Sequence, residues 1–326
     1  MRTSSNPNIN KKIESNKAIH RIVSAVYVPN LEGYFRDYIE ILRFFLDSVV
    51  STKSVESKLT IVNNNSCFQI SNLLRQYFDD GHIDVLINQR ENIGKIDAIM
   101  EVVHGCEEEF VTITDCDILF KQGWEQSVFK TFSTFKNVGS VSPIPLRGSS
   151  FYWTSSVQLQ IILKRLKYSK ESLPENISDH NRYLNSIGWP SEDGKGKYWS
   201  VVENCGERAI MGSGHAVITI RSSILKKFSP KIRSNVFMGK SSETDYLDIP
   251  IDRSGMLRLS TKHNYAFHMG NTPEKWFNEV NFVGKTESLD FYDFTTHDIN
   301  LKHNMLKNYW FKKKLISVIF NLFYRN

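Results

Sequence analysis

The chain has 326 residues and a formal net charge of +6, and 40% of its residues are hydrophobic. This length and composition suit a globular protein with one large α/β domain, or a domain with an appendage. The basic excess is mild and comes without an RNA-binding aromatic motif, a zinc-finger spacing or a dense Lys/Arg helix, so nucleic acid is excluded as the expected partner.

Residues 1–19 are polar and rich in Asn and Ser, which predicts a disordered tail and not a secretory signal. No run of about 18 apolar residues occurs, so no membrane-spanning helix is predicted. Cys67, Cys106, Cys116 and Cys205 form no Cys-x-x-Cys pair and fit no zinc spacing. Reduced thiols in a cytoplasmic protein are therefore expected.

Apolar strand patterns and helical patterns alternate through the first half of the chain. In order, they predict a strand at 22–28, a helix at 34–50, a strand at 58–62, a helix at 68–78, a strand at 83–87, a helix opened by 91–95 and running to 104, and a strand at 109–114. Alternation at such short intervals predicts an α/β fold with a mixed, mostly parallel sheet flanked by helices.

Four polar clusters come directly after these strands. They are Pro29-Asn30, Asn63 to Ser66, Arg90 to Lys95, and Asp115 to Asp117. Ligands of parallel sheets bind at the carboxyl ends of the strands, so the clusters should line one edge of the sheet. Two carboxylates separated by one residue at such an edge can hold a divalent cation against a diphosphate.

The second half of the chain is less regular. A strand is expected at 138–141, a second strand at 216–220 with a helix at 222–228, and a third strand at 264–267. Between the first two, residues 147–206 read as an insertion with one helix near 157–168 and a long polar remainder. Long segments of this kind are often lids or binding surfaces.

The last segment, 301–326, combines aromatic residues with a lysine triplet. Trp310 and Phe311 precede Lys312 to Lys314, and an apolar run follows that is too short to span a membrane. This pattern is typical of an amphipathic helix lying on an anionic membrane surface. A helix packed on the domain is the alternative that the pattern leaves open.

Several of these motifs resemble those of the GT-A glycosyltransferases, specifically glycosyltransferase family two and its bacterial polysaccharide relatives. The resemblance runs from about Ile22 to Thr272, interrupted by the insertion. The motifs that carry it are, in order, Pro29-Asn30, Asn63-Asn64-Asn65-Ser66, Asn92-Ile93-Gly94-Lys95, Asp115-Cys116-Asp117, Gly212-Ser213-Gly214-His215-Ala216, Ser242-Glu243-Thr244-Asp245-Tyr246-Leu247 and His268-Met269-Gly270-Asn271.

The resemblance implies a GT-A fold and a metal-dependent, inverting glycosyltransferase. Such an enzyme moves a sugar from a nucleotide-diphosphate sugar, with UDP expected before GDP, to a glycan or a polyprenyl-linked acceptor. The Gln-x-x-Arg-Trp element of processive synthases is absent, which implies transfer of one residue at a time. A cytoplasmic protein at the inner face of the cytoplasmic membrane is expected.

The resemblance also implies a role for each landmark. Asp117 and His268 would bind Mn²⁺ or Mg²⁺, and Asp245, or as second choice Glu243, would be the general base. The residues expected to bind the donor are Pro29, Asn30, Asn63, Asn65, Arg90, Asn92, Gly94, Lys95 and Asp115.

Two departures from the family pattern leave alternatives open. Asn63 stands where the family usually has a base-contacting aspartate, so the nucleobase stays open. Glu-Thr-Asp replaces the usual Glu-Asp, so the base stays open between Glu243 and Asp245. An inactive sugar-nucleotide-binding or glycan-binding module and a retaining transferase are the alternative functions. A nucleotidyltransferase usually needs a Gly-rich basic loop after the first strand, and residues 28–31 lack one.

Overall fold

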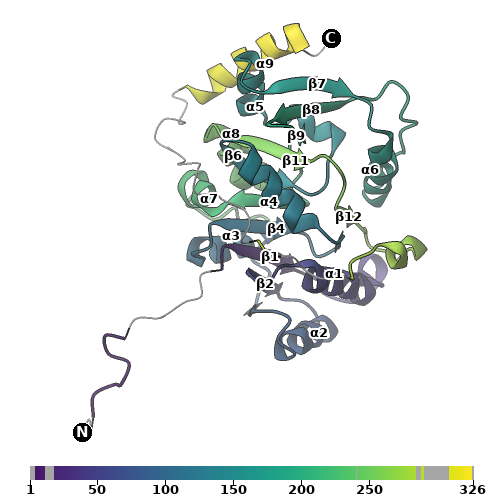
Figure 1. The fold of residues 1–326 in the computed structure, drawn as a ribbon. Coiled ribbons are helices and arrows are strands. Elements are labelled where there is room, and N and C mark those ends of the chain that lie inside the picture. The colour runs from purple at the N-terminus through teal and green to yellow at the C-terminus, as the bar shows by residue number, and fades with distance from the viewer. Residues whose placement is uncertain (1–3, 12–17, 240, 284–287, 290–307, 325–326) are drawn as a thin grey trace.

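The computed structural model describes residues 4–11, 18–239, 241–283, 288–289 and 308–324 (Figure 1). The first half contains β1 (His20–Val26), η1 (Gly33–Phe35), α1 (Tyr38–Thr52), β2 (Ser57–Asn64), α2 (Phe68–Asp79), β3 (Val85–Gln89), α3 (Lys95–Gly105), β4 (Phe110–Thr114), β5 (Ile118–Phe120), α4 (Trp124–Thr134) and β6 (Val138–Ser142). The second half contains η2 (Arg147–Phe151), α5 (Ser155–Ile162), β7 (Lys167–Glu171), α6 (Pro174–Ser186), β8 (Trp199–Asn204), β9 (Glu207–Met211), β10 (Val217–Arg221), α7 (Ser222–Phe228), η3 (Thr244–Asp248), α8 (Ile249–Arg253), β11 (Leu257–Thr261), β12 (Ala266–His268), η4 (Lys275–Glu279) and α9 (Tyr309–Tyr324).

Within the described residues, ten strands form one sheet in the order β3-β2-β1-β4-β10-β6-β11-β9-β8-β7. Their pairings show that β1, β2, β3, β4, β6, β8 and β11 run in one direction, while β7, β9 and β10 run in the other. The expected mixed, mostly parallel sheet is therefore confirmed. The short strands β5 and β12 form a second, two-stranded sheet.

Helices cover both sides of the large sheet (Figure 1). In β1, Ile22 belongs to the apolar core that includes residues of α1, α2 and α4, and Val23 belongs to the core that includes residues of α3, α7 and α8. Successive residues of a strand point to opposite faces, so a strand between two helical layers must be apolar at consecutive positions. This is why the run at 22–28 predicts a buried strand.

Residues 147–206 form regular elements where a long polar segment was expected. After α5, the chain forms β7, then α6, and then β8, which pairs with both β7 and β9 and so extends the large sheet. The sequence of β7 is Lys-Tyr-Ser-Lys-Glu, without buried apolar alternation. Edge strands are often charged in this way, which hides them from pattern analysis. The interpretation of 147–206 as an insertion stays a prediction.

The chain ends differ in how they meet the domain. Residues 4–11 are exposed, and the rest of the expected N-terminal tail lies partly outside the described residues. At the other end, α9 packs against α5 and buries Phe320, while 301–307 and 325–326 lie outside the described residues. In the part of the chain that the structure describes, no helix combines the length and apolar character needed to cross a bilayer.

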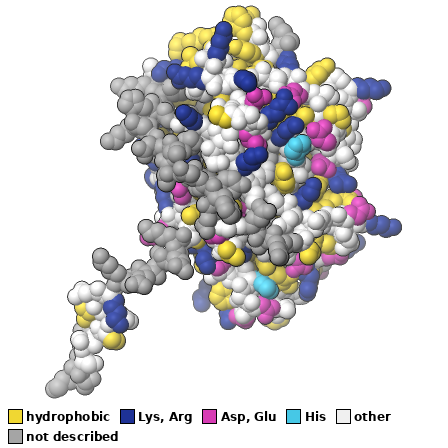
Figure 2. Space-filling model, in the orientation of Figure 1, with side chains coloured by type: hydrophobic (Ala, Val, Ile, Leu, Met, Phe, Trp, Pro, Cys, Tyr) yellow, Lys and Arg dark blue, Asp and Glu magenta, His cyan; other side chains and the backbone are white. Residues whose placement is uncertain are grey.

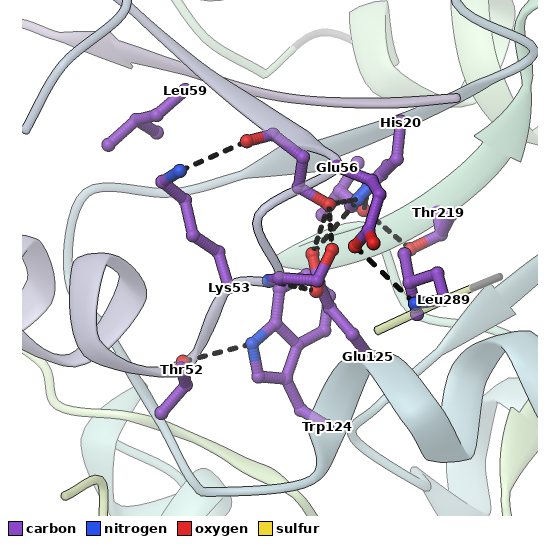
Figure 3. A network of polar contacts seen from close by, with 12 residues as sticks. His20, Thr52, Lys53, Glu56, Leu59, Trp124, Glu125, Thr219 and Leu289 are labelled. Atoms are coloured by element: carbon purple, nitrogen blue, oxygen red, sulfur yellow. Dashed lines mark hydrogen bonds and ion pairs between the residues drawn. The ribbon is translucent and has the colours of Figure 1, made fainter. Parts of the chain in front are cut away.

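A buried polar network ties α4 to the first two strands (Figure 3). The carboxylate of Glu125 accepts hydrogen bonds from the backbone N–H of Ser54 at 2.5 Å and the hydroxyl of Ser57 at 2.8 Å, and its Oε1 lies 3.0 Å from Nδ1 of His20. The other ring nitrogen of His20 lies 2.7 Å from Oγ1 of Thr112 in β4. These partners satisfy a carboxylate that has no exposure to water.

Replacing Glu125 with Ala should therefore destabilise the fold. The change leaves Ser54 N–H, Ser57 and His20 without their shared acceptor, and breaking such a buried cluster costs about 3–5 kcal/mol. Glu101, in an exposed ion pair with Arg233, is the control, because Glu101→Ala should cost about 1 kcal/mol or less. Urea unfolding would measure both, and equal losses in the two variants would contradict a structural role for the network.

Candidate active site

The site is assembled by the small two-stranded sheet. β4 delivers Asp115 and Asp117 to the edge of the large sheet, and the chain continues directly into β5. β5 pairs antiparallel with β12 so that Ile118 lies opposite His268, and Met269 N–H donates to the backbone carbonyl of Asp117 at 2.8 Å. This register sets the His268 ring beside the Asp117 carboxylate, with Nε2 3.5 Å from Oδ2.

The side chains of Asp115, Asp117 and His268 form a cluster that can hold a metal ion. One ligand atom from each lies within 4.8 Å of the others. Asp117 Oδ1 is buried and has no hydrogen-bond partner among the described residues, which is costly for a carboxylate oxygen. A divalent cation would supply the missing partner, and two carboxylates with one imidazole suit Mn²⁺ or Mg²⁺. The donor set therefore fits the metal expected from the sequence.

A hydrogen bond from α6 fixes which nitrogen of His268 faces the carboxylates. His268 Nδ1 lies 2.8 Å from Oγ of Ser186, and the Ser186 hydroxyl donates to the backbone carbonyl of Tyr183. Because the Ser186 hydroxyl proton is used in the bond to Tyr183, Ser186 Oγ accepts from Nδ1–H of His268. The neutral ring then presents the lone pair of Nε2 toward Asp117, as a metal-binding histidine does.

Lys95 stands at the start of α3 because the preceding residue is a glycine. Gly94 has φ +93°, and a Cβ there would lie 2.3 Å from the carbonyl oxygen of Val236. The Lys95 ammonium lies 2.5 Å from Asp115 Oδ1 and 3.6 Å from Glu243 Oε1. Burial lowers the pKa of Lys95, but these carboxylates outweigh it and raise the pKa to about 12. Lys95 is therefore a permanent cation between the two acids.

The carboxylate of Asp117 is less well compensated by positive charge than the carboxylates beside Lys95. Burial raises the pKa of Asp117, His268 lowers it and Asp115 raises it again, with a net upward shift. Burial and the neighbouring acid also raise the pKa of Tyr34 and of Tyr38, whose hydroxyl donates to Asp117 Oδ2 at 3.4 Å. The ionised carboxylate of Asp117 is thus under-compensated by the protein alone.

Of the two candidate bases, Glu243 lies with this cluster. It is buried, it contacts Lys95, and its Oε2 accepts from the Ser242 hydroxyl at 3.0 Å. Asp245 is exposed and lines a separate groove that includes Ile232. On a helix, side chains that are two positions apart point in directions about 160–200° apart. Only one of Glu243 and Asp245 can therefore face the metal cluster. The distances favour Glu243, the second choice from sequence.

The asparagines expected to contact the donor also build the loops. Asn63 is buried, and its amide donates to Ser71 and Asn88 and accepts from Ser66 N–H. Asn92 Oδ1 accepts from the Asn64 amide at 2.8 Å and from Gly94 N–H at 2.9 Å, which shapes the turn before Lys95. A donor contact by either side chain would be added to, or exchanged for, these bonds.

The remaining expected donor contacts lie on the surface of the same loops. Pro29 is half-buried, whereas Asn30, Asn65 and Arg90 are exposed. Asn30 Oδ1 accepts from Glu32 N–H, and Asn65 adopts φ +68°. Their roles in donor binding stay predictions.

Sequence reasoning missed His215 as a site residue. Its Nδ1 lies 3.4 Å from Oδ2 of Asp248, whose Oδ1 accepts from the Arg258 guanidinium at 2.6 Å, and both partners are fully buried. Burial lowers the pKa of His215, but the Asp248 carboxylate outweighs it and raises the pKa, with Lys95 and Glu243 also acting on the ring. His215 thus borders the same site. The Gly-Ser-Gly run before it was the one available signal.

Asp117→Asn should raise the stability of the metal-free protein. An acid whose pKa is raised by folding binds more protons when folded, so ionisation costs stability as pH rises through that range. In EDTA the variant should melt above the wild type, with a larger gap at pH 7 than at pH 4, because the ordinary carboxyl pKa lies near the lower end of this range. Added Mn²⁺ should raise the melting temperature of the wild type and leave the variant unchanged.

The matched control is Asp79→Asn on α2, an exposed carboxylate paired with Arg75. Its melting temperature should stay close to wild type in EDTA and rise with Mn²⁺ as the wild type does. A metal-free Asp117→Asn protein that melts below the wild type, or one that Mn²⁺ still stabilises, would contradict the assignment of Asp117 as an under-compensated ligand.

Comparison with known sequences finds one family. Residues 34–188, which are 155 of the 326, match the model described as glycosyl transferase family 2. The match contains the Asp-x-Asp pair and Lys95, and His268 lies beyond it. The resemblance expected from Ile22 to Thr272 is confirmed over this segment. No curated protein matches the chain.

Three solved structures illustrate what this chain is similar to. S. aureus TarS 1-349 has 12% identity and a TM-score of 0.43, with 77% of this chain and 60% of that chain covered. TarS 1-349 in complex with UDP-GlcNAc has 12% identity and a TM-score of 0.44, with 90% and 72% covered. The mannosyltransferase PcManGT from Pyrobaculum calidifontis, in complex with GDP-Man and Mn²⁺, has 11% identity and a TM-score of 0.44, with 95% and 77% covered.

Proposed function

We infer that this chain is a glycosyltransferase, because its residues 34–188 match the model described as glycosyl transferase family 2. We propose a metal-dependent, non-processive, inverting enzyme that takes a sugar from a UDP-sugar or a GDP-sugar. The acceptor would be a glycan or a polyprenyl-linked glycan.

One observation supports metal dependence above all others. Asp115 and Asp117 from the end of β4 meet His268 from β12, and a buried oxygen of Asp117 has no partner among the described residues. A divalent cation bound there would neutralise the charge that develops on the departing diphosphate. Lys95 and the N-terminal end of α3 face the same site, and both favour anionic groups.

Glu243 is the residue we propose as general base. Its carboxylate would take the proton from the acceptor hydroxyl as that oxygen bonds to the anomeric carbon. The bond from this carbon to the diphosphate breaks in the same step, and the nucleoside diphosphate leaves. Attack from the face opposite the leaving group inverts the anomeric centre. The Lys95 ammonium lies 3.6 Å from Glu243 Oε1, which holds this carboxylate within the same cluster.

Donor binding should be measurable without knowledge of the acceptor. In Mn²⁺, a UDP-sugar or GDP-sugar at about 100 times its Kd should stabilise the wild type by about 2.7 kcal/mol. Asp117→Ala should lose this stabilisation, as should wild type in EDTA, whereas Asp79→Ala should keep it. Slow release of nucleotide in Mn²⁺ would separate an enzyme from an inactive binding module. Equal stabilisation of Asp117→Ala by the donor would contradict the site.

The base can be identified by two isosteric variants. Glu243→Gln should lower kcat by on the order of 10²-fold or more with little change in donor binding, because it removes the proton acceptor. Asp245→Asn should stay within a few-fold of wild type, because that side chain is exposed and away from the cluster. Steady-state transfer assays would measure both. The opposite result would restore Asp245 as the base.

A further inference from the structure

The C-terminal helix α9 leaves a large apolar surface uncovered. Its exposed side chains are between 49% and 71% accessible, and they are Trp310, Phe311, Leu315, Val318, Leu322 and Phe323. Figure 2 shows hydrophobic side chains gathered at the top of the molecule, where α9 lies in Figure 1. Single exposed apolar residues are ordinary, but a contiguous set marks an interaction surface.

Helical spacing puts most of this set on one stripe. Phe311, Leu315, Val318 and Leu322 follow one another at intervals of four, three and four residues, so they lie along one face. The buried residues Tyr309, Ile316 and Phe320 lie on the opposite face. The helix is therefore apolar on two sides, and the domain needs only one of them.

The buried face holds α9 firmly in this orientation. The Tyr309 hydroxyl donates to Asp252 at 2.7 Å, and the Ser317 hydroxyl donates to Gln158 of α5 at 3.2 Å. The Lys313 ammonium lies 3.1 Å from the ring centroid of Trp153, which also packs edge-on against Trp310. With these contacts in place, the outer stripe cannot turn inward without breaking the packing.

The charges beside the stripe are basic. α9 carries Lys312, Lys313 and Lys314 and no acidic residue. Lys312 and Lys314 are exposed, and the exposed Leu163, Lys164 and Arg165 follow α5, against which α9 packs. Figure 2 shows Lys and Arg side chains among and beside the hydrophobic surface. An apolar stripe bordered by cations matches the chemistry of an anionic bilayer surface.

We propose that α9 docks this protein on the anionic face of a lipid bilayer. The helix would lie in the plane of the interface, with Phe311, Leu315, Val318 and Leu322 among the acyl chains. Lys312 and Lys314 would meet the lipid phosphates. At 16 residues, α9 is shorter than the roughly 20 that span a bilayer, so it lies on the membrane and does not cross it. This proposal concerns location and is independent of the proposed transfer reaction.

The same charges disfavour a second copy of this chain as the occupant. In a symmetric dimer, the same patch on each copy meets itself. The interface would then contain Lys312 and Lys314 of both copies, and α9 offers no carboxylate to pair with them. An anionic leaflet supplies the opposite charge and attracts each lysine.

Vesicle sedimentation tests the proposal with the full chain. The wild type should bind vesicles of phosphatidylcholine with about 30% phosphatidylglycerol, and only weakly vesicles of phosphatidylcholine alone. Phe311→Gln with Leu322→Gln should lower the partition coefficient at least about tenfold, because two apolar side chains leave the interface. Lys312→Gln with Lys314→Gln should lower it about tenfold on the anionic vesicles and little on neutral ones.

The matched control is Val55→Gln with Phe68→Gln, which removes two similarly exposed apolar side chains, one between α1 and β2 and the other at the start of α2, whereas α9 packs against α5. This variant should bind vesicles as the wild type does, and circular dichroism should show that all variants remain folded. The proposal would be overturned if the wild type did not bind anionic vesicles, or if the control variant lost as much vesicle binding as the Phe311/Leu322 variant. It would also be overturned if light scattering showed that the wild type is a dimer and the Phe311/Leu322 variant is a monomer.

Discussion

The pairing of β5 with β12 is the constraint on which the site depends. These two strands contribute only three residues each, yet their register decides that His268 stands beside Asp117 across 150 residues of intervening chain. The backbone bond from Met269 to the Asp117 carbonyl closes the same junction. A shift of one residue would turn the imidazole to the other face of the small sheet, because side chains alternate along a strand. The position of the candidate metal ligands thus depends on a few backbone hydrogen bonds between two short strands whose apolar residues, such as Ile118, Phe120 and Ala266, belong to the large core.

The charges in the site are arranged as two groups with different balance. Asp115 and Glu243 share the half-buried ammonium of Lys95, so this group is close to satisfied as it stands. Around Asp117, one oxygen lacks a partner and the pKa is raised. The under-compensated group is where a cation fits, and the compensated group, which includes Glu243, lies next to it. The ionised carboxylate of Asp117 therefore lowers the stability of the metal-free fold, and a cation bound at the same position would restore that stability.

The sequence predicted the parts of this molecule whose pattern is local. Continuous apolar runs such as the one in β1 identify strands buried on both faces, and the polar turns after them identify the binding edge. The strand β7 was not predicted, because its charged edge sequence lacks an alternation of apolar and polar residues. The choice between Glu243 and Asp245 depended on the rotation of a helical turn, which spacing alone does not give. His215 depended on Asp248 and Arg258 from other elements, so no local pattern could reveal it.

The hydrogen bond between Ser186 and His268 links α6 to β12. Ser186 ends α6, a helix from the segment 147–206 that was interpreted as an insertion, and it sets the tautomer of the His268 ring, which faces the carboxylates. Exchanging that helix for one of a different length, in evolution or in the laboratory, would change the ring's proton arrangement without touching any ligand. A chimeric protein with a new helix at this place would therefore need a hydroxyl retained at position 186 to keep the Nε2 lone pair of His268 directed toward Asp117.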